Sequence, residues 1–270
     1  YEIMPSLVGS EMCIRDSPYD EALIFDSHAH YDDAKFDDER EALLAELPSR
    51  GVCGVVNCGC DTASSKTALK LADSYGYIYA AVGIHPENIG GGTVNEIRTL
   101  AKHKKCVAIG EIGLDYYWVS DNKEQQKELF SQQLELANEI NKPVIVHDRD
   151  AHSDTLELLK KHRPKGVVHS FSGSTEMAKE ILKLGMYIGI GGVITFKNAK
   201  KLPEVVKMLP EDRFLLETDA PYLTPVPYRS KINNSAMIYL TAQKIAEIRN
   251  IDTVHILTAA RENAKNLFGI

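Results

Sequence analysis

The stretch Leu23-Ile24-Phe25-Asp26-Ser27-His28-Ala29-His30 joins the start of a buried strand to two metal-competent side chains. Alternate side chains of a strand point to the same face, so His28 and His30 are expected to project together from a strand end. A neutral imidazole is the commonest protein metal ligand. Two histidines at this spacing also occur on ordinary surfaces, so a metal site is indicated only if other strands supply partners.

Nearly continuous, β-branched apolar runs recur along the chain, and eight can be counted. Runs of this kind are typical of parallel strands that are covered on both faces. They span Leu23–Asp26, Val52–Asn57, Ile78–Gly83, Cys106–Gly110, Pro143–His147, Gly166–His169, Met186–Gly191 and Phe214–Glu217.

Stretches with helical periodicity lie between many of these runs, and two more close the chain. They span Asp37–Arg50, Ala63–Tyr75, Lys123–Asn141, Ser174–Leu184, Ala199–Met208, Ser235–Arg249 and Thr253–Phe268. Eight strand–helix units in about 250 residues predict an α/β fold, a (β/α)8 TIM barrel in a single domain. The alternative is a doubly wound open sheet, which seldom reaches eight regular units.

Residues 1–20 show no periodicity, and Ser6–Ser17 resembles a translated cloning or sequence-assembly leader. We interpret residues 1–20 as such a leader, or as a loosely ordered arm, and exclude them from the fold. The barrel domain is therefore expected to span residues 21–270.

Composition limits the possible partners. The 31 basic and 38 acidic residues give a net charge of −7, which excludes the broad basic surface of a typical nucleic-acid binder. No apolar run reaches the ~20 residues needed to cross a bilayer, so no membrane partner is expected. Five cysteines, an odd number in a long chain, indicate reduced thiols rather than a set of disulfides, and therefore a cytoplasmic protein. Cys58 and Cys60 are interpreted as packing residues. We expect a monomer.

The carboxyl ends of barrel strands meet at one mouth, where barrel active sites lie. Metal-competent side chains end six of the eight runs: His28 and His30, His85, Glu111, His147, His169, and Asp219. The remaining histidines fall in helical stretches and are expected at the surface: His103, His152, His162 and His255.

A converging cluster of histidines with two carboxylates is costly to bury unless cations occupy it, so the pattern predicts a metal site. Six ligands suit two divalent ions ~3.5–4 Å apart, bridged by a carboxylate and a hydroxide, which favours hydrolysis. Mixed nitrogen and oxygen ligands are compatible with Mg, Mn, Zn or Fe, and the sequence does not choose between them.

Six blocks, in order, resemble the signature of the TatD family of metal-dependent deoxyribonucleases, which are amidohydrolase-like barrels. The blocks are Asp26–His30, Gly83–Pro86, Gly110–Tyr116, His147 with Arg149–Ala151, His169–Gly173, and Glu217–Pro225. The resemblance implies a TIM barrel with two divalent ions. One ion would be held by His28, His30, Glu111 and Asp219. The second would be held by Glu111, His147 and His169.

The resemblance also implies a mechanism, in which Asp219 steers a metal-bridging hydroxide onto phosphorus and His85 contacts the phosphate or leaving group. The expected activity is 3′→5′ exonuclease action on single-stranded DNA, with RNA or apurinic sites as further substrates. The expected substrate-binding residues are Arg149, Arg229, Lys231 and Tyr222. The aromatic residues Tyr116, Tyr117, Trp118 and Tyr222 could stack on bases or serve only in packing.

The sequence departs from the family after Leu223-Thr224-Pro225, where the family usually reads Arg-Gly-Lys-Arg-Asn-Glu-Pro. Here Arg229–Ser235 reads Arg-Ser-Lys-Ile-Asn-Asn-Ser. Loss of the glycine is expected to alter the loop backbone. Loss of an arginine removes a bidentate phosphate donor, so the substrate contacts rather than the metal set would be affected.

Two alternatives remain. The first is another binuclear metallohydrolase that cleaves a cyclic amide, a lactone or a phosphoester, because one fold hosts many chemistries. Against it, Glu111 stands where such barrels usually carry a carboxylated lysine. The second is a non-catalytic metal-binding barrel, which the complete ligand set disfavours.

Overall fold

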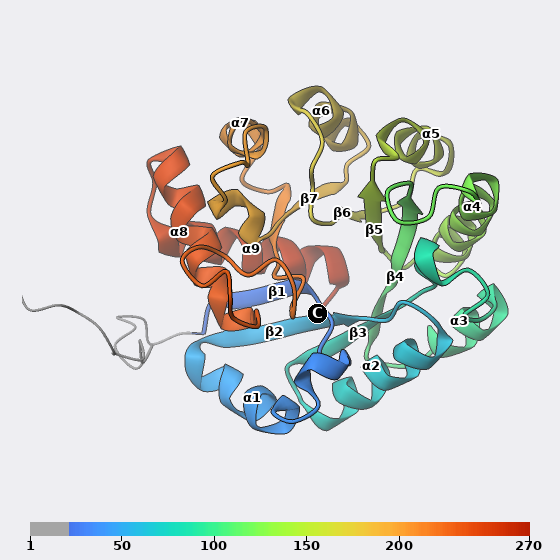
Figure 1. Cartoon of the computed structure of the whole chain (residues 1–270), viewed down its shortest axis with the longest axis horizontal. Helices are drawn as coiled ribbons and strands as arrows, with labels where there is room; N and C mark the ends of the chain where they lie inside the picture. Colours follow the sequence, from blue (N-terminus) through green and yellow to red (C-terminus); the bar gives the residue numbers. More distant parts are fainter. Residues whose placement is uncertain (1–21) are drawn as a thin grey trace, which may run out of the picture.

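Eight parallel strands, paired in sequence order, form a barrel in the computed structural model, which describes residues 22–270 (Figure 1). The expected (β/α)8 fold is confirmed, and the leader assigned to residues 1–20 lies outside the described residues. The strands are β1 (Ile24–Ala29), β2 (Val52–Cys58), β3 (Ile78–Val82), β4 (Cys106–Asp115), β5 (Val144–Arg149), β6 (Gly166–Val168), β7 (Tyr187–Ile190) and β8 (Phe214–Leu216).

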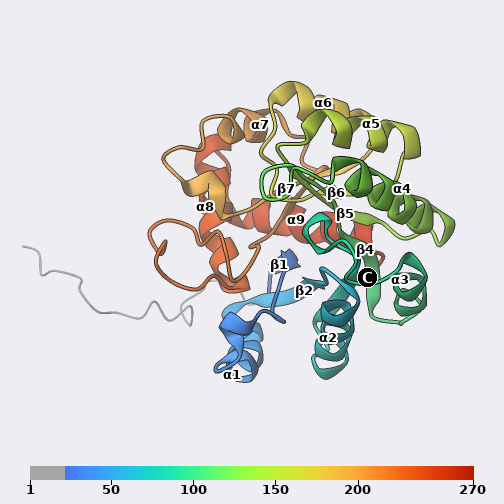
Figure 2. The ribbon, with the colours of Figure 1, turned by 45° about the vertical axis from the view of Figure 1, so that its right-hand side comes forward.

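Helices surround the strands as an outer ring (Figure 1). The ring comprises α1 (Arg40–Glu46), α2 (Thr62–Ser74), α3 (Val94–Leu100), α4 (Lys123–Glu139), α5 (His152–His162), α6 (Thr175–Lys183), α7 (Leu202–Met208) and α8 (Ile238–Arg249). The last helix, α9 (Thr253–Phe268), packs against β1, β8 and α8 (Figure 2). None of the helices in the described part of the chain is both long and apolar enough to cross a bilayer.

Prolines explain where two helices are shorter than the periodicity predicts. The stretch expected to be helical over Asp37–Arg50 divides into α1 and a 3-10 turn, Leu47–Arg50, with Pro48 near the start of that turn. The helix expected from Ala199 begins only at Leu202, next to Pro203. Proline is tolerated in the first turn of a helix but not in its interior, where it lacks the N–H donor and its ring clashes with the preceding turn. Each of these prolines therefore marks the start of a new helical segment.

Four strands, β1, β2, β4 and β5, extend further than their apolar runs, and β1 and β4 do so by the most residues. β1 continues through His28 to Ala29, and β4 continues five residues past Gly110 to Asp115. The end of β4 stays in the sheet because it pairs with β5, with Gly113 opposite His147 and Asp115 opposite Arg149. Pairing with β5 thus keeps the last residues of β4 in an extended conformation, although they lie beyond the apolar run that predicts the strand.

The barrel interior is filled by a cluster to which seven of the eight strands contribute. Its strand members include Phe25, Val56, Ala81, Val107, Ile145, Val167 and Leu215. Phe25 and His28 are three residues apart, so strict alternation would place them on opposite faces. The register of β1 against β2 shifts between Asp26 and Ala29, which allows both side chains to lie inside the barrel.

Asp26 closes the barrel between its first and last strands. The buried carboxylate accepts hydrogen bonds from the backbone N–H groups of His28 and Thr218, and from the hydroxyls of Thr218 and Ser235. Backbone bonds complete the seam, since Asp219 N–H donates to His28 O at 3.0 Å and His30 N–H donates to Ala220 O at 2.7 Å. Burial raises the pKa of Asp26 to about 6, and its hydrogen bonds limit that rise.

Asp26→Ala should lower the free energy of unfolding by roughly 3 kcal/mol, because two buried N–H groups and two hydroxyls lose their acceptor. Urea unfolding of the metal-free protein, followed by circular dichroism, measures the change. The exposed Asp212 is the matched control, and Asp212→Ala should cost less than about 1 kcal/mol. Equal effects of the two substitutions would show that Asp26 does not stabilise the seam.

Candidate metal centre

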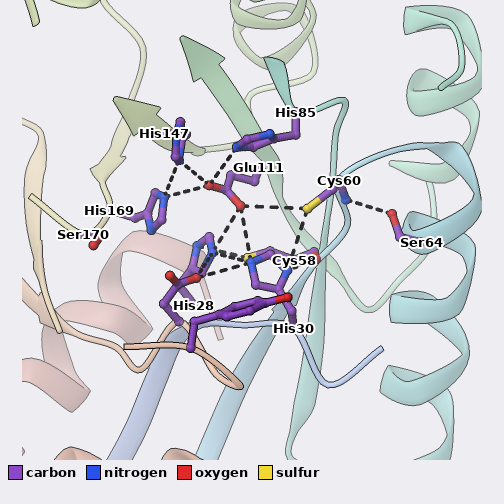
Figure 3. Close-up of polar contacts among 12 residues, drawn as sticks. His28, His30, Cys58, Cys60, Ser64, His85, Glu111, His147, His169 and Ser170 are labelled. Carbon is purple, nitrogen blue, oxygen red and sulfur yellow. Dashed lines mark hydrogen bonds and ion pairs between the residues drawn. The ribbon is translucent and has the colours of Figure 1, made fainter. Parts of the chain in front are cut away.

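Glu111 lies at the centre of the barrel mouth, and each of its carboxylate oxygens faces a different group of histidines (Figure 3). Oε2 faces His28 and His30 of the first strand segment. Oε1 faces a second group, which comprises His85, His147 and His169. The side chain of Glu111 is only 4% exposed, so these imidazoles form most of its polar surroundings.

The first group has the spacing of a coordination shell. His28 Nε2 and His30 Nε2 are 3.0 Å apart and lie 3.3 and 3.4 Å from Glu111 Oε2. Asp219 Oδ1 is 3.6 and 3.5 Å from the same two nitrogens. Ligands at ~2.1 Å from a tetrahedral metal ion are separated from one another by ~3.4 Å. The donor set therefore fits a divalent cation.

The second group is arranged in the same way around the other oxygen. Glu111 Oε1 lies 2.9 Å from His147 Nδ1 and 2.7 Å from His169 Nε2, and these two nitrogens are 3.2 Å apart. His85 Nε2 is further away, at 3.5 Å. The structure thus brings together all six residues expected as metal ligands, with histidine, glutamate and aspartate groups placed to bind metal ions.

Hydrogen bonds on the outer ring nitrogens decide which nitrogen is free to bind a metal. His30 Nδ1 lies 2.9 Å from Cys58 O, a carbonyl that can only accept, so Nδ1 carries the proton and Nε2 is free. His147 is held in the opposite sense, because its Nε2 lies 3.0 Å from Asp115 Oδ2 and its Nδ1 faces the cluster.

His85 differs from these ligands. Its Nδ1 accepts a hydrogen bond from the backbone N–H of Glu87 at 3.2 Å, so in the neutral ring the proton lies on Nε2. Burial lowers the pKa of His85, which favours that neutral form. Nε2–H then points toward Glu111 as a donor. His85 is therefore suited to donate to an anionic group beside the cluster rather than to bind a cation.

Electrostatics keep the carboxylates ionised despite their burial. Burial alone would raise the pKa of Glu111, but His169, His28 and His85 more than offset it and hold the pKa well below its usual range. The pKa of Asp219 is likewise lowered against burial, chiefly by its hydrogen bond to His30. Burial lowers the pKa of His147, but Asp115 and Glu111 overcome this effect and raise it to about 10. Protons on histidines thus occupy positions where cations would supply the positive charge.

Three residues at the site were not expected from the sequence. Asp115 positions His147, as described above. Glu217 is buried beside His169, with its Oε1 at 3.9 Å from His169 Nδ1, and burial raises its pKa to about 8. Cys60 lies after β2, with Sγ at 4.0 Å from Glu111 Oε2 and 3.8 Å from His30 Nδ1. Packing was the role expected for Cys58 and Cys60, but both line the cluster, since the Sγ of buried Cys58 also lies 3.4 Å from His28 Nδ1.

A sequence signal existed for two of these residues. Asp115 and Glu217 both follow apolar runs, within the blocks that carry Glu111 and Asp219. No local pattern shows which oxygen of a carboxylate meets which imidazole, because those partners lie 32 or more residues away in the chain. Of the other histidines, His152, His162 and His255 lie in helices as expected, whereas His103 lies in the turn after α3.

The four expected substrate-binding residues lie around the mouth rather than in the cluster. Arg149 is exposed at the end of β5, with its guanidinium 4.2 Å from the Tyr117 ring centroid. Arg229 donates to Thr224 O and lies 3.8 Å over the ring of Phe196. The remaining two residues are exposed: Lys231, and Tyr222, whose hydroxyl donates to Asp33.

The loop that departs from the family pattern does not need a glycine at position 230. Its left-handed residue is Leu223, with a φ of 51°, and Ser230 is not among the described positions with positive φ. The backbone at Ser230 therefore suits a residue other than glycine in this chain, because only a positive φ would favour glycine there, and the expected difference from the family's loop stays a prediction.

A parallel barrel with buried histidines and carboxylates at the carboxyl ends of its strands is typical of one class of proteins, the metal-dependent hydrolases. Residues 25–269 match the family described as TatD related DNase. The chain belongs to this TatD family of metal-dependent hydrolases, which confirms the resemblance seen in the sequence.

Individual relatives agree with this assignment. The chain is 41% identical over 254 residues to the uncharacterized metal-dependent hydrolase YabD of Bacillus subtilis, a match that covers 92% of this chain and 100% of YabD. It is 35% identical to YcfH of Escherichia coli K12, covering 92% and 96% of the two chains. The crystal structure of YJJV, a TatD homolog from Escherichia coli K12, has a TM-score of 0.86 at 32% identity, covering 92% of this chain and 99% of that one.

Glu111→Ala should reduce the number of divalent ions bound per chain by at least one, because both histidine groups lose their shared anion. Elemental analysis after metal loading and desalting measures the stoichiometry. His103→Ala removes a histidine whose ring contacts the surface aspartate Asp73 and accepts the backbone N–H of Lys105, and it should leave the metal content unchanged. Unchanged stoichiometry in Glu111→Ala would refute the shared position of this carboxylate.

Asp115→Asn should weaken binding of one metal ion by about 10- to 100-fold. Asp115 Oδ1 accepts two backbone N–H groups, so the asparagine oxygen is expected to stay there and its amide to face His147 Nε2. His147 Nε2 must then accept, which moves the proton to Nδ1 and blocks the nitrogen that faces the cluster. Competition titrations with a chelating dye measure the affinity, and an unchanged affinity would exclude this role of Asp115.

Proposed function

We propose that this protein is a deoxyribonuclease that hydrolyses phosphodiester bonds with two divalent metal ions, acting as a 3′→5′ exonuclease on single-stranded DNA. One observation carries the proposal: the two oxygens of Glu111 serve two separate groups of histidines. A shared carboxylate between two adjacent metal positions is typical of sites that cleave phosphate esters by in-line displacement. The description of the matching family as TatD related DNase supports the same chemistry.

The charge distribution is compatible with a nucleic-acid substrate. The chain carries a net charge of −7, so attraction to a polyanion must be local. The mouth offers Arg149, Arg229 and Lys231, all exposed, and the cations expected in the cluster would add positive charge at its centre. An exonuclease that releases each product benefits from such limited contact, because it need not hold a long stretch of DNA.

When bound, the metal ions would polarise the phosphodiester and favour ionisation of a water molecule. Asp219 is suited to orient that water and accept its proton. Its Oδ1 lies beside His28 and His30, and its side chain is 20% exposed, compared with 4% for Glu111. Its lowered pKa keeps it ionised, as a proton acceptor requires.

His85 is suited to the opposite task. Its Nε2–H donor, fixed by the bond from Glu87 to Nδ1, lies 3.5 Å from Glu111 Oε1 at the edge of the second histidine group. A phosphate oxygen or leaving oxygen beside the cluster could receive this hydrogen bond as negative charge develops. His85 therefore complements Asp219, which acts on the water.

Asp219→Asn should fold normally but lower nuclease turnover by at least 100-fold, because the amide cannot accept the proton. Metal-loaded protein is incubated with single-stranded oligonucleotides that carry a label at either the 3′ or the 5′ end, with and without chelator. The order in which the two labels are released reports the direction of digestion.

Asp150→Asn is the matched control for Asp219→Asn. Asp150 is also an aspartate with a left-handed backbone at a strand end, with a φ of 54° compared with 57° for Asp219. The turnover of the Asp150→Asn variant should change by only a few-fold. Absence of chelator-sensitive degradation by the unmodified protein would refute the nuclease proposal. The lactone, cyclic amide and phosphotriester substrates of related chemistry would then be assayed in its place.

A further inference from the structure

Two aromatic side chains project from the mouth into solvent. Tyr117 is 54% exposed and Trp118 is 62% exposed, and their rings meet edge to face at 4.8 Å. Large aromatic rings contribute most to stability when they are buried, so an adjacent pair with this exposure gains little from packing. The neighbouring Tyr116 is different, because its hydroxyl donates to Asp154 and its ring is partly buried.

The pair is tied to the metal centre by one buried carboxylate. Asp115 Oδ1 accepts the backbone N–H groups of Tyr117 and Trp118 at 2.9 and 2.8 Å. Asp115 Oδ2 lies 3.0 Å from His147 Nε2, and His147 Nδ1 faces Glu111. The position of the aromatic pair is therefore fixed relative to the cluster through a single fully buried side chain.

Arg149 completes this surface. Its guanidinium carbon lies 4.2 Å from the centroid of Tyr117 and 5.4 Å from that of Trp118. Arg149 follows His147 by two residues on β5, so the two side chains leave the strand on the same face about 6.6 Å apart. The backbone of the aromatic pair, which is joined to His147 through Asp115, and the start of the Arg149 side chain thus lie within about one nucleotide of the cluster. We call Tyr117, Trp118 and Arg149 the aromatic platform.

We propose that the aromatic platform is a base-stacking subsite, which binds an unpaired nucleobase adjacent to the phosphodiester at the metal centre. The inference rests on the proposed function and specifies how that site recognises its substrate. Unpaired bases stack on exposed aromatic rings and on arginine, and every base offers a face for this contact. Base-paired DNA does not present that face, so the subsite selects single strands.

Trp118 allows a direct test, because it is the only tryptophan in the chain. Asp219→Asn protein, loaded with metal, is titrated with a single-stranded oligonucleotide while the tryptophan fluorescence is followed. Stacking should quench the emission. An abasic oligonucleotide of equal length, which keeps the phosphates but lacks bases, should leave the emission nearly unchanged. Equal quenching by the two oligonucleotides, or none by either, would overturn the proposal.

Variants separate stacking from charge. Tyr117→Ala and Arg149→Ala, each in the Asp219→Asn background, should weaken the fluorescence-detected binding by roughly 5- to 100-fold, which corresponds to the loss of one stacked base. Arg213 is the matched control, since it also lies over an aromatic ring, Tyr187, but at the amino end of β8. Arg213→Ala should leave binding unchanged. Equal losses from Arg149→Ala and Arg213→Ala would indicate a nonspecific charge effect and contradict the subsite.

Kinetics distinguish this inference from the proposed function. In an otherwise unmodified enzyme, Trp118→Ala should raise KM for the normal oligonucleotide and leave KM for the abasic one unchanged, and Trp118→Phe should restore most of the loss. Asp115 holds backbone N–H groups, so the alanine variant keeps its anchor. Chelator-sensitive cleavage with an unchanged KM would refute the subsite and leave the nuclease intact. Base-dependent quenching without cleavage would keep the subsite and refute the nuclease.

Discussion

The buried carboxylate of Glu111 is the constraint on which the mouth of this barrel depends. A carboxylate that is nearly removed from water is costly unless positive charge surrounds it, and five imidazoles lie around this one. They come from β1, β5 and the segments that follow β1, β3 and β6. One carboxylate therefore contacts residues from several strands around the barrel. Protons or metal ions can provide that positive charge, and only metal ions add hydrolytic chemistry.

The fold makes this arrangement possible by closing between β1 and β8. Asp26 accepts hydrogen bonds from Thr218 and Ser235, which lie 192 and 209 residues further along the chain. This seam places His28 and His30 next to Asp219. The strained backbone of Asp219, with a φ of 57°, persists because the surrounding hydrogen bonds determine it. Stability and catalytic geometry at the mouth therefore share the same contacts.

One residue outside the ligand set connects the metal centre to the aromatic platform. Asp115 fixes the ring of His147 with one oxygen and the backbone of Tyr117 and Trp118 with the other. A change in metal occupancy at His147 and a change in the position of the aromatic platform would thus affect the same carboxylate. Under the proposed function, this coupling would link the chemistry at the phosphate to recognition of the base beside it.

The sequence by itself determined the eight strands, the barrel and the set of metal-competent residues, because these depend on local periodicity and on the rule that parallel strands end at one mouth. Only the tertiary structure decided which side chains of the site contact one another. It divided the oxygens of Glu111 between two groups, set the proton of His147 through Asp115, and placed Cys60 and Glu217 beside the cluster. It also shifted the register of β1, so that His28 turns inward together with Phe25. These features depend on hydrogen bonds between residues far apart in the chain, which no local pattern specifies.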